Sequence, residues 1–247
     1  MQAIILAAGM GKRLKQLTQN NTKCMVKVNG TPMINRTLSQ LERCSLSRIV
    51  IVVGYEGHKL MEHIRTLDIK TPVVFIDNPI YNKTNNIYSL FLAKDYLLEE
   101  DTLLLESDVI FEDSVLDCLV NDPRDSLALV AKYEAWMDGT CVRLSEQDDI
   151  IDMISKKQFR FSEIDDYYKT VNLYKFSRTH YVPFLEAYTK ALGNNEYYEQ
   201  VLKVLVALDD PGIKAKRLSP DQKWYEIDDI QDLDIAESMF APEKERT

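Results

Sequence analysis

Short apolar segments alternate with amphipathic segments through the first half of the chain. Four segments of strand length consist mostly of aliphatic residues, and the segments between them repeat apolar residues at helical spacing. The predicted strands are Ala3–Ala7, Arg48–Val53, Pro72–Ile76 and Thr102–Glu106, and the predicted helices are Pro32–Cys44, Glu56–Arg65 and Asn86–Leu98. This alternation is typical of a parallel sheet covered by helices.

Beyond residue 126 the apolar segments become shorter and richer in aromatic and β-branched residues. The predicted strands are Leu127–Lys132, Thr140–Leu144, Ile150–Ile154, Tyr168–Phe176, Ile213–Leu218 and Trp224–Ile227. Helices are predicted at Ser177–Leu192, Glu196–Leu208 and Ile230–Phe240. Such strands favour antiparallel or mixed additions to a sheet. The sequence therefore predicts an α/β fold with a mixed, mostly parallel central sheet, flanking helices and a small antiparallel addition.

Two helix starts carry capping signals. Thr31 can cap the first predicted helix, with Pro32 at its first position, where a missing N–H does no harm. Asp229 stands before the last predicted helix and is expected to cap it.

Composition and charge narrow the class of protein. At 247 residues and 45% hydrophobic, the chain can form one large domain, which we place at residues 1–240, followed by a polar tail at 241–247. The net charge of −9 argues against nonspecific nucleic-acid binding. No apolar run is long enough for a signal peptide or a membrane span, so we expect a cytoplasmic protein. The cysteines and histidines lack zinc-site spacing.

The first predicted strand runs into a short glycine loop with two cations. Gly9 and Gly11 let backbone amides approach an anion closely, and Lys12 and Arg13 add charged donors. The glycine spacing fits neither the P-loop pattern nor the dinucleotide fingerprint, which needs a third glycine where Leu14 stands. The loop therefore predicts a cradle for the triphosphate of a nucleotide.

Acidic residues follow two other predicted strands. Asp108 comes two residues after Thr102–Glu106, and Glu226 and Asp228 alternate near the end of the chain, so both project from one face of an extended segment. Ligands of open parallel sheets bind beyond the carboxyl ends of the strands. Carboxylates that converge there beside a triphosphate are suitable ligands for Mg²⁺. We therefore predict that these three residues hold Mg²⁺.

These segments together resemble the sugar-1-phosphate nucleotidyltransferase superfamily. Its pattern appears here as Leu6–Leu14, followed by Lys23 and by Val28–Pro32. The segments Asn85–Leu90 and Tyr225–Asp228 resemble the small CTP-using branch, which includes the phosphocholine cytidylyltransferases. Tyr167–Phe176 and Ala191–Gln200 resemble, more closely, the cytidylyltransferases that activate 2-aminoethylphosphonate. The resemblance implies a Rossmann-like nucleotidyltransferase fold.

The resemblance also implies a reaction and roles for the residues. An oxygen of a phosphonate or phosphate attacks the α-phosphorus of CTP, and pyrophosphate leaves. Gly9, Gly11, Lys12 and Arg13 would hold the leaving phosphates, and Lys23 would lie across the α-phosphate and the incoming oxygen. Further nucleotide contacts are expected from Leu6, Ala7, Ala8, Gly54, Tyr55, Asn85 and Asn86. The two asparagines can read the cytosine, but they can equally be helix caps.

The second substrate is expected to be a small phosphonate or phosphate that carries an amine. A quaternary ammonium favours an aromatic cage, whereas a primary ammonium favours carboxylate acceptors, and the sequence offers both. The candidate residues are Lys132, Trp136, Asp138, Lys156, Tyr197, Tyr198 and Glu199. We expect 2-aminoethylphosphonate; phosphocholine, a sugar 1-phosphate and a non-catalytic nucleotide-binding role remain alternatives. Relatives of this kind are often fused to an aminotransferase, which would suit the polar end.

Overall fold

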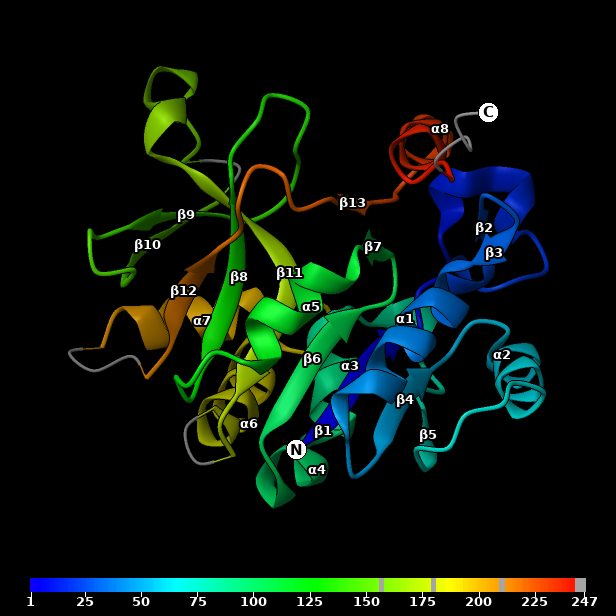
Figure 1. Cartoon of the computed structure of the whole chain (residues 1–247). Helices are drawn as coiled ribbons and strands as arrows, with labels where there is room; N and C mark the ends of the chain where they lie inside the picture. Colours follow the sequence, from blue (N-terminus) through cyan, green and yellow to red (C-terminus); the bar gives the residue numbers. More distant parts are fainter. Residues whose placement is uncertain (156–157, 179–180, 209–211, 243–247) are drawn as a thin grey trace.

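A computed structural model describes residues 1–155, 158–178, 181–208 and 212–242 of the chain (Figure 1). Within these residues the central feature is a nine-stranded sheet. Its main strand order is β10-β9-β11-β6-β1-β4-β5, and β8 pairs with both β11 and β12 beside this path. The predicted α/β class with a mixed, mostly parallel sheet is confirmed.

The parallel part of the sheet is built from β1 (Gln2–Ala7), β4 (Ile49–Val53), β5 (Val73–Asp77) and β6 (Thr102–Glu106). The strand β1 pairs with β4 on one side and with β6 on the other, and Leu6 lies opposite both Val52 and Glu106. The carboxyl ends of β1 and β6 therefore meet at one edge. The glycine loop and the segment that holds Asp108 begin at this edge.

Helices cover both faces of the sheet, because successive side chains of a strand point to opposite sides. On one face, Ile5, Ile51 and Leu105 pack with α1 (Met33–Leu41), α2 (Gly57–Arg65) and α5 (Asp113–Val120). On the other face, Ile4, Val50 and Leu104 pack with further helices. These are α3 (Asn86–Leu92), α4 (Lys94–Glu99), α6 (Val182–Leu192) and α7 (Glu199–Val206).

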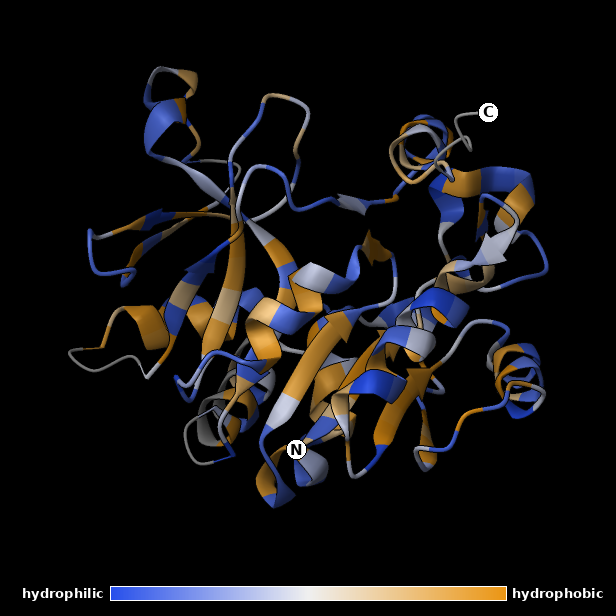
Figure 2. Ribbon diagram, in the orientation of Figure 1, coloured by the Kyte–Doolittle hydropathy of each residue, from blue (hydrophilic) through white to orange (hydrophobic). Residues whose placement is uncertain are grey.

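Hydropathy follows this layering. Figure 2 shows the central strands mostly in the hydrophobic colour, while the helices carry both colours along their length. No helix among the described residues is both long and apolar enough to span a bilayer.

The second half of the chain extends the sheet in mixed directions. The long strand β11 (Tyr168–Phe176) is antiparallel to β6 and to β8 (Leu127–Lys132). The remaining strands there are β9 (Cys141–Leu144), β10 (Ile150–Ile154) and β12 (Lys214–Arg217). Since β11 joins β6 directly, residues of the second half reach the edge where the glycine loop lies.

A third apolar cluster brings three distant segments together. Leu14, Val28, Ile110, Ile227 and Leu233 all belong to it. They come from the 3-10 helix η1 (Lys12–Thr18), from β2 (Lys27–Val28), which pairs with β3 (Thr31–Pro32), from β7 (Val109–Phe111), from the residue after its partner β13 (Trp224–Glu226), and from α8 (Ile230–Met239). In Figure 1, α8 lies beside β2 and β3 although almost the whole chain separates them.

Several local predictions were wrong. The first helix begins at Met33, because Thr31 and Pro32 pair with β2 as strand β3. The helix predicted over Asn86–Leu98 is interrupted at Ala93, and α6 and α7 begin only at Val182 and Glu199. The sequence analysis missed α5, β7 and β2. The predicted cap Asp229 is confirmed, since its side chain accepts hydrogen bonds from the backbone N–H groups of residues 231 and 232.

Candidate active site

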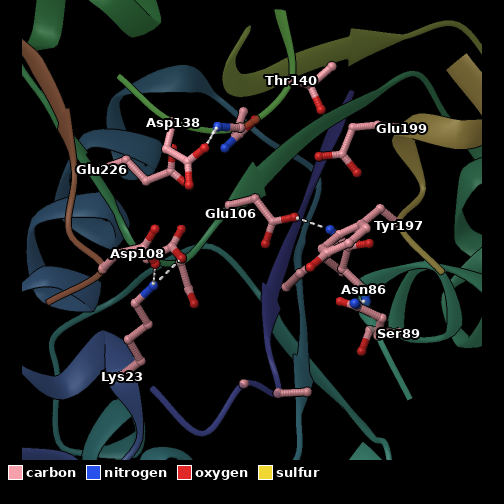
Figure 3. Close-up of a pocket in the computed structure, with 18 of the residues that line it drawn as sticks. Lys23, Asn86, Ser89, Glu106, Asp108, Asp138, Thr140, Tyr197, Glu199 and Glu226 are labelled. Carbon is pink, nitrogen blue, oxygen red and sulfur yellow. Dashed lines mark hydrogen bonds and ion pairs between the residues drawn. The ribbon is translucent and has the colours of Figure 1, made fainter. Parts of the chain in front are cut away.

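A cavity of about 900 Å³ lies beyond the carboxyl ends of β1 and β6. Its walls come from the glycine loop, from the segment after β6, and from β11, β13 and the start of α7 (Figure 3). Predicted site residues that line it are Leu6, Ala8, Gly9, Gly11, Lys12, Arg13, Lys23, Asn85, Asn86, Asp108, Asp138, Tyr197, Glu199, Glu226 and Asp228. Most of the predicted site thus converges on one cavity.

The two glycines of the loop differ in backbone conformation and in the space around them. Gly11 has a φ of +58°, and a Cβ placed there would lie 3.0 Å from the Cβ of Lys23, so this position needs glycine. At Gly9, by contrast, a Cβ would meet nothing within 4 Å. The Gly9 side of the loop is therefore open toward the cavity, as a phosphate cradle requires.

Three residues predicted to bind the nucleotide do not line the cavity. Ala7 is buried within the sheet. Gly54 packs against Ala8, where a Cβ would come within 2.9 Å, and the N–H of Tyr55 donates to the carbonyl of Ala8 at 3.2 Å. These residues support the loop from the side of β4, because the ends of β1 and β4 are adjacent.

Lys23 stands at the centre of a row of opposite charges. Its Nζ donates to Oδ2 of Asp108 at 2.5 Å and to Oδ1 of Asp228 at 2.7 Å. Arg13 approaches the same Asp228 oxygen at 2.6 Å. Burial disfavours the charged amine, but the two aspartates outweigh this effect and raise the pKa of Lys23. Lys23 is therefore a fixed cation at the edge of the cavity.

Three carboxylates form a compact group at the same place. Asp108, Glu226 and Asp228 each offer an oxygen, and these oxygens all lie within 4.8 Å of one another. The pairing of β7 with β13 creates the group, because Val109 lies opposite Glu226 and the N–H of Ile227 donates to the carbonyl of Asp108 at 2.9 Å.

The chemistry of this group fits a divalent cation. Oδ1 of Asp108 is buried and has no hydrogen-bond partner among the described residues. A hard cation with oxygen ligands would satisfy that atom, and Mg²⁺ uses few protein carboxylates together with phosphate oxygens. Asp108, Glu226 and Asp228 are thus suited to hold Mg²⁺ beside the glycine loop.

A buried lysine that the sequence analysis missed borders this group. Lys169 lies on β11 and is 1% exposed, and its Nζ is 3.2 Å from Oε2 of Glu226. It also donates to the carbonyl of Thr170 at 2.6 Å. The sequence did offer a signal for Lys169, because it stands in a predicted strand of mostly aromatic and β-branched residues. A lysine buried in such a strand is expected to be paired with an acidic group.

The two asparagines fill structural positions. Asn85 caps α3 by accepting from the N–H of Asn86, which confirms the alternative of a helix cap. The Asn86 side chain donates to Oε1 of Glu106 at 3.1 Å and accepts from the N–H of Tyr198 at 2.9 Å. Both residues still line the cavity, but their described contacts are with the protein.

The residues predicted to bind the second substrate divide into two groups. Asp138, Tyr197 and Glu199 line the cavity. Lys132 lines a separate surface hollow with Tyr168 and Arg217, because strand β8 directs it away.

The aromatic residues mostly lie elsewhere. Trp136 is outside the cavity lining and stacks on Tyr225 with ring centroids 4.6 Å apart. Tyr198 is fully buried and packs edge-on against Tyr174. Lys156 is outside the described residues.

Further lining residues were not predicted from the sequence. They are Asn78, Tyr81, Thr84, Ser89, Glu106, Thr140, Met153, Lys169, Asn172, Gln200 and Lys203, among others. Of these, Glu106 carried a signal, because an acidic residue ends an otherwise apolar strand. The others come from loops, from strands such as β10 and β11 and from helices α3 and α7, and only the tertiary structure brings them to the cavity.

The cavity carries unusually placed acidic side chains. Burial raises the pKa of Glu106 well above its ordinary value, and the nearby charges of Asp108 and Glu199 add to this effect. Burial likewise raises the pKa of Glu199 and of Glu226. For Asp228 burial acts in the same direction, but Lys23 and Arg13 outweigh it and the pKa is lowered. Lys23 and Arg13 thus favour the ionised form of Asp228.

Comparisons with curated proteins find relatives along the whole chain. A CMP-5'-(3-aminopropyl)phosphonate synthase from Streptomyces rubellomurinus is 30% identical over 251 residues, and the match covers all of this chain but 40% of that protein. A CTP:phosphoglutamine cytidylyltransferase from Campylobacter jejuni is 29% identical over 95% of this chain and 98% of its own length. A 2-aminoethylphosphonate cytidylyltransferase from Lancefieldella rimae is 39% identical over 45% of this chain and 44% of its own length.

Solved structures share the fold. The CTP:phosphocholine cytidylyltransferase from Streptococcus pneumoniae superposes with a TM-score of 0.78 over 96% of this chain and 97% of its own, at 23% identity. The inositol-1-phosphate CTP transferase from T. maritima gives a TM-score of 0.77 at 22% identity, over 96% of this chain and 94% of its own. The sequence model of the MobA-like NTP transferase domain matches residues 3–202. The chain therefore belongs to the MobA-like NTP transferase domain family.

Proposed function

We propose that this chain is a cytidylyltransferase that transfers CMP from CTP to 2-aminoethylphosphonate and releases pyrophosphate. One observation carries the proposal: Lys23 and Arg13 meet Asp108 and Asp228 beside an open glycine loop, within one cavity. The names of the relatives support CTP as the nucleotide and a phosphonate or phosphate as the acceptor.

The reaction asks for positioning and charge neutralisation more than for covalent chemistry. A phosphonate oxygen forms a bond to the α-phosphorus of CTP, and the bond from that phosphorus to the bridging oxygen of pyrophosphate breaks. The amides of Gly9 and Gly11, with Lys12 and Arg13, would hold the departing phosphates. Lys23 would stabilise the charge that develops between the α-phosphate and the incoming oxygen.

A metal ion is part of the proposal. Asp108, Glu226 and Asp228 would hold Mg²⁺. When bound, Mg²⁺ neutralises phosphate charge during the transfer. Lys169 lies beside Glu226 and offsets part of the negative charge of the three carboxylates, so that an anionic substrate can approach them.

A pyrophosphate-release assay tests the proposal. The protein is incubated with Mg²⁺ and each of CTP, UTP, ATP and GTP, against 2-aminoethylphosphonate, phosphocholine and glucose 1-phosphate. We expect release with CTP and 2-aminoethylphosphonate. Asp108→Asn should reduce the rate at least about 100-fold, while the exposed control Asp68→Asn should not.

Two results would contradict the proposal at different levels. If no pair of nucleotide and acceptor releases pyrophosphate, the chain is not the proposed enzyme, and a nucleotide-binding role is favoured. Strong release with phosphocholine or glucose 1-phosphate alone would retain the chemistry and overturn the acceptor.

A further inference from the structure

Two further carboxylates in the cavity are not members of the group suited to Mg²⁺. Glu106 ends β6, and Glu199 begins α7. Both line the cavity, and in the view of Figure 3 Glu106 lies between Asp108 and Glu199, with Asn86 and Tyr197 on the Glu199 side. They come from opposite halves of the chain, so their proximity is a product of the fold.

Asn86 fixes this arrangement. Its Oδ1 accepts from the N–H of Tyr198, so its amide nitrogen faces the acidic side chains and donates to Oε1 of Glu106. Two backbone bonds reinforce the junction, since the N–H of Asn85 donates to the carbonyl of Asn194 and the N–H of Ile87 to that of Glu196. The start of α7 is thereby attached to the start of α3.

Within the part of the chain that the structure describes, neither Glu106 nor Glu199 lies within ion-pair distance of a lysine, an arginine or a histidine, although the charge of Lys169 acts on Glu199 from farther away. Lys169 is paired with Glu226 instead. Oε2 of Glu199 is buried and accepts no hydrogen bond from any residue that the structure describes. Buried acidic groups are normally paired and hydrogen-bonded, so a cationic group from a ligand would complete the site.

We infer that Glu106 and Glu199, held by Asn86, form the subsite for the amino group of the acceptor and select a primary ammonium over a quaternary one. The inference rests on the proposed function. A primary ammonium brings three N–H donors, which match the unpartnered oxygen of Glu199 and its neighbour. A trimethylammonium group carries the same charge but no N–H, and would leave that oxygen unsatisfied.

The aromatic residues do not provide the alternative site. A quaternary ammonium is usually held over the faces of aromatic rings. Trp136 stacks on Tyr225 away from the cavity lining, and Tyr198 is buried in the core. Tyr197 lines the cavity but is 54% exposed, and Tyr81, which also lines it, packs edge-on against Tyr55. The described part of the cavity therefore offers carboxylates where a cage would need rings.

Two acceptors that differ only at nitrogen test the inference. Calorimetry measures the binding of 2-aminoethylphosphonate and of 2-(trimethylammonio)ethylphosphonate to the full chain with Mg²⁺ and a CTP analogue that has a methylene between the α- and β-phosphorus atoms. The wild type should bind the primary amine at least about 100-fold more tightly, as expected when a buried acceptor rejects a ligand that lacks its donor. Glu199→Gln should lower this preference to below about 10-fold, with the affinity for the CTP analogue unchanged. Glu186→Gln, a half-buried acid on α6 that does not line the cavity, is the matched control.

The outcomes separate this inference from the proposed function. Equal binding of the two acceptors by the wild type, or an unchanged preference in Glu199→Gln, would overturn the amino subsite even if pyrophosphate is released. A preference that Trp136→Ala changes and Glu199→Gln does not would also overturn it and favour an aromatic cage. Failure to bind the CTP analogue at all would count against the proposed function instead. Asn86→Asp adds a charge at the same junction and should weaken CTP-analogue binding less than acceptor binding.

Discussion

At the scale of single residues, the site depends on pairs of opposite charge that the chain holds close together. Lys23 contacts two aspartates, and Lys169 contacts Glu226. Each pair is partly or fully buried, and removing one partner of such a pair costs more than the pair contributes, because the other charge is left uncompensated. Substitutions here therefore affect both chemistry and stability.

Lys23→Met is expected to reduce pyrophosphate release at least about 100-fold, because it removes the cation nearest to the proposed reacting oxygens. The loss should lie in kcat more than in the KM for CTP. Steady-state kinetics measure the effect. Lys27→Met, an exposed lysine four residues later, is the control and should keep the wild-type rate. A Lys23→Met variant with more than half of the wild-type kcat would exclude Lys23 from the reaction.

At the scale of elements, the loop after β1 is shaped by what lies around it. Lys23 and Thr18 crowd the space beside Gly11, while Gly9 faces open space. The two glycines of one motif thus differ in their surroundings: Gly11 is required by its positive φ and by its contact with Lys23, whereas Gly9 borders open space.

Gly11→Ala and Gly9→Ala should therefore separate stability from binding. The first adds a Cβ 3.0 Å from Lys23 at a φ of +58°, and should lower the free energy of unfolding by about 1–2 kcal/mol. The second should change it by no more than about 0.5 kcal/mol, yet weaken CTP binding, because the new methyl group occupies the open side of the loop. Urea denaturation and calorimetry measure the two effects. Equal destabilisation by both variants would contradict this distinction.

At the scale of the whole molecule, the site joins segments from the two ends of the chain. The third apolar cluster packs η1, β7, β13 and α8 together, and this packing carries Lys23, Asp108 and Asp228 to one point. A ligand that contacts all of them stabilises the folded state, because these segments separate on unfolding.

CTP with Mg²⁺ at about 100 times its dissociation constant should stabilise the chain by about 2.7 kcal/mol. For a domain of this size, that corresponds to a rise in Tm of roughly 5–10 °C. Chelation with EDTA should remove most of the rise, and so should Asp108→Asn, since both disable the proposed metal site. Differential scanning fluorimetry with and without each component measures this. A full rise in EDTA would show that CTP binds without the metal.

The sequence by itself determined the strands of the parallel core, the glycine loop with its adjacent cations and the carboxylates that gather beside it. Continuous aliphatic runs, a glycine pair with adjacent cations, and acidic residues directly after strands are local signals, and their physical causes act over a few residues. Helix boundaries were less accurate, because Thr31 and Pro32 are as compatible with a strand pair as with a cap. The pairing of Glu226 with Lys169, the junction that Asn86 makes between α3 and α7, and the removal of Trp136 and Lys132 from the cavity were decided only by the tertiary structure. These features depend on which strands become neighbours, and the packing of distant apolar side chains, rather than any local pattern, sets that choice.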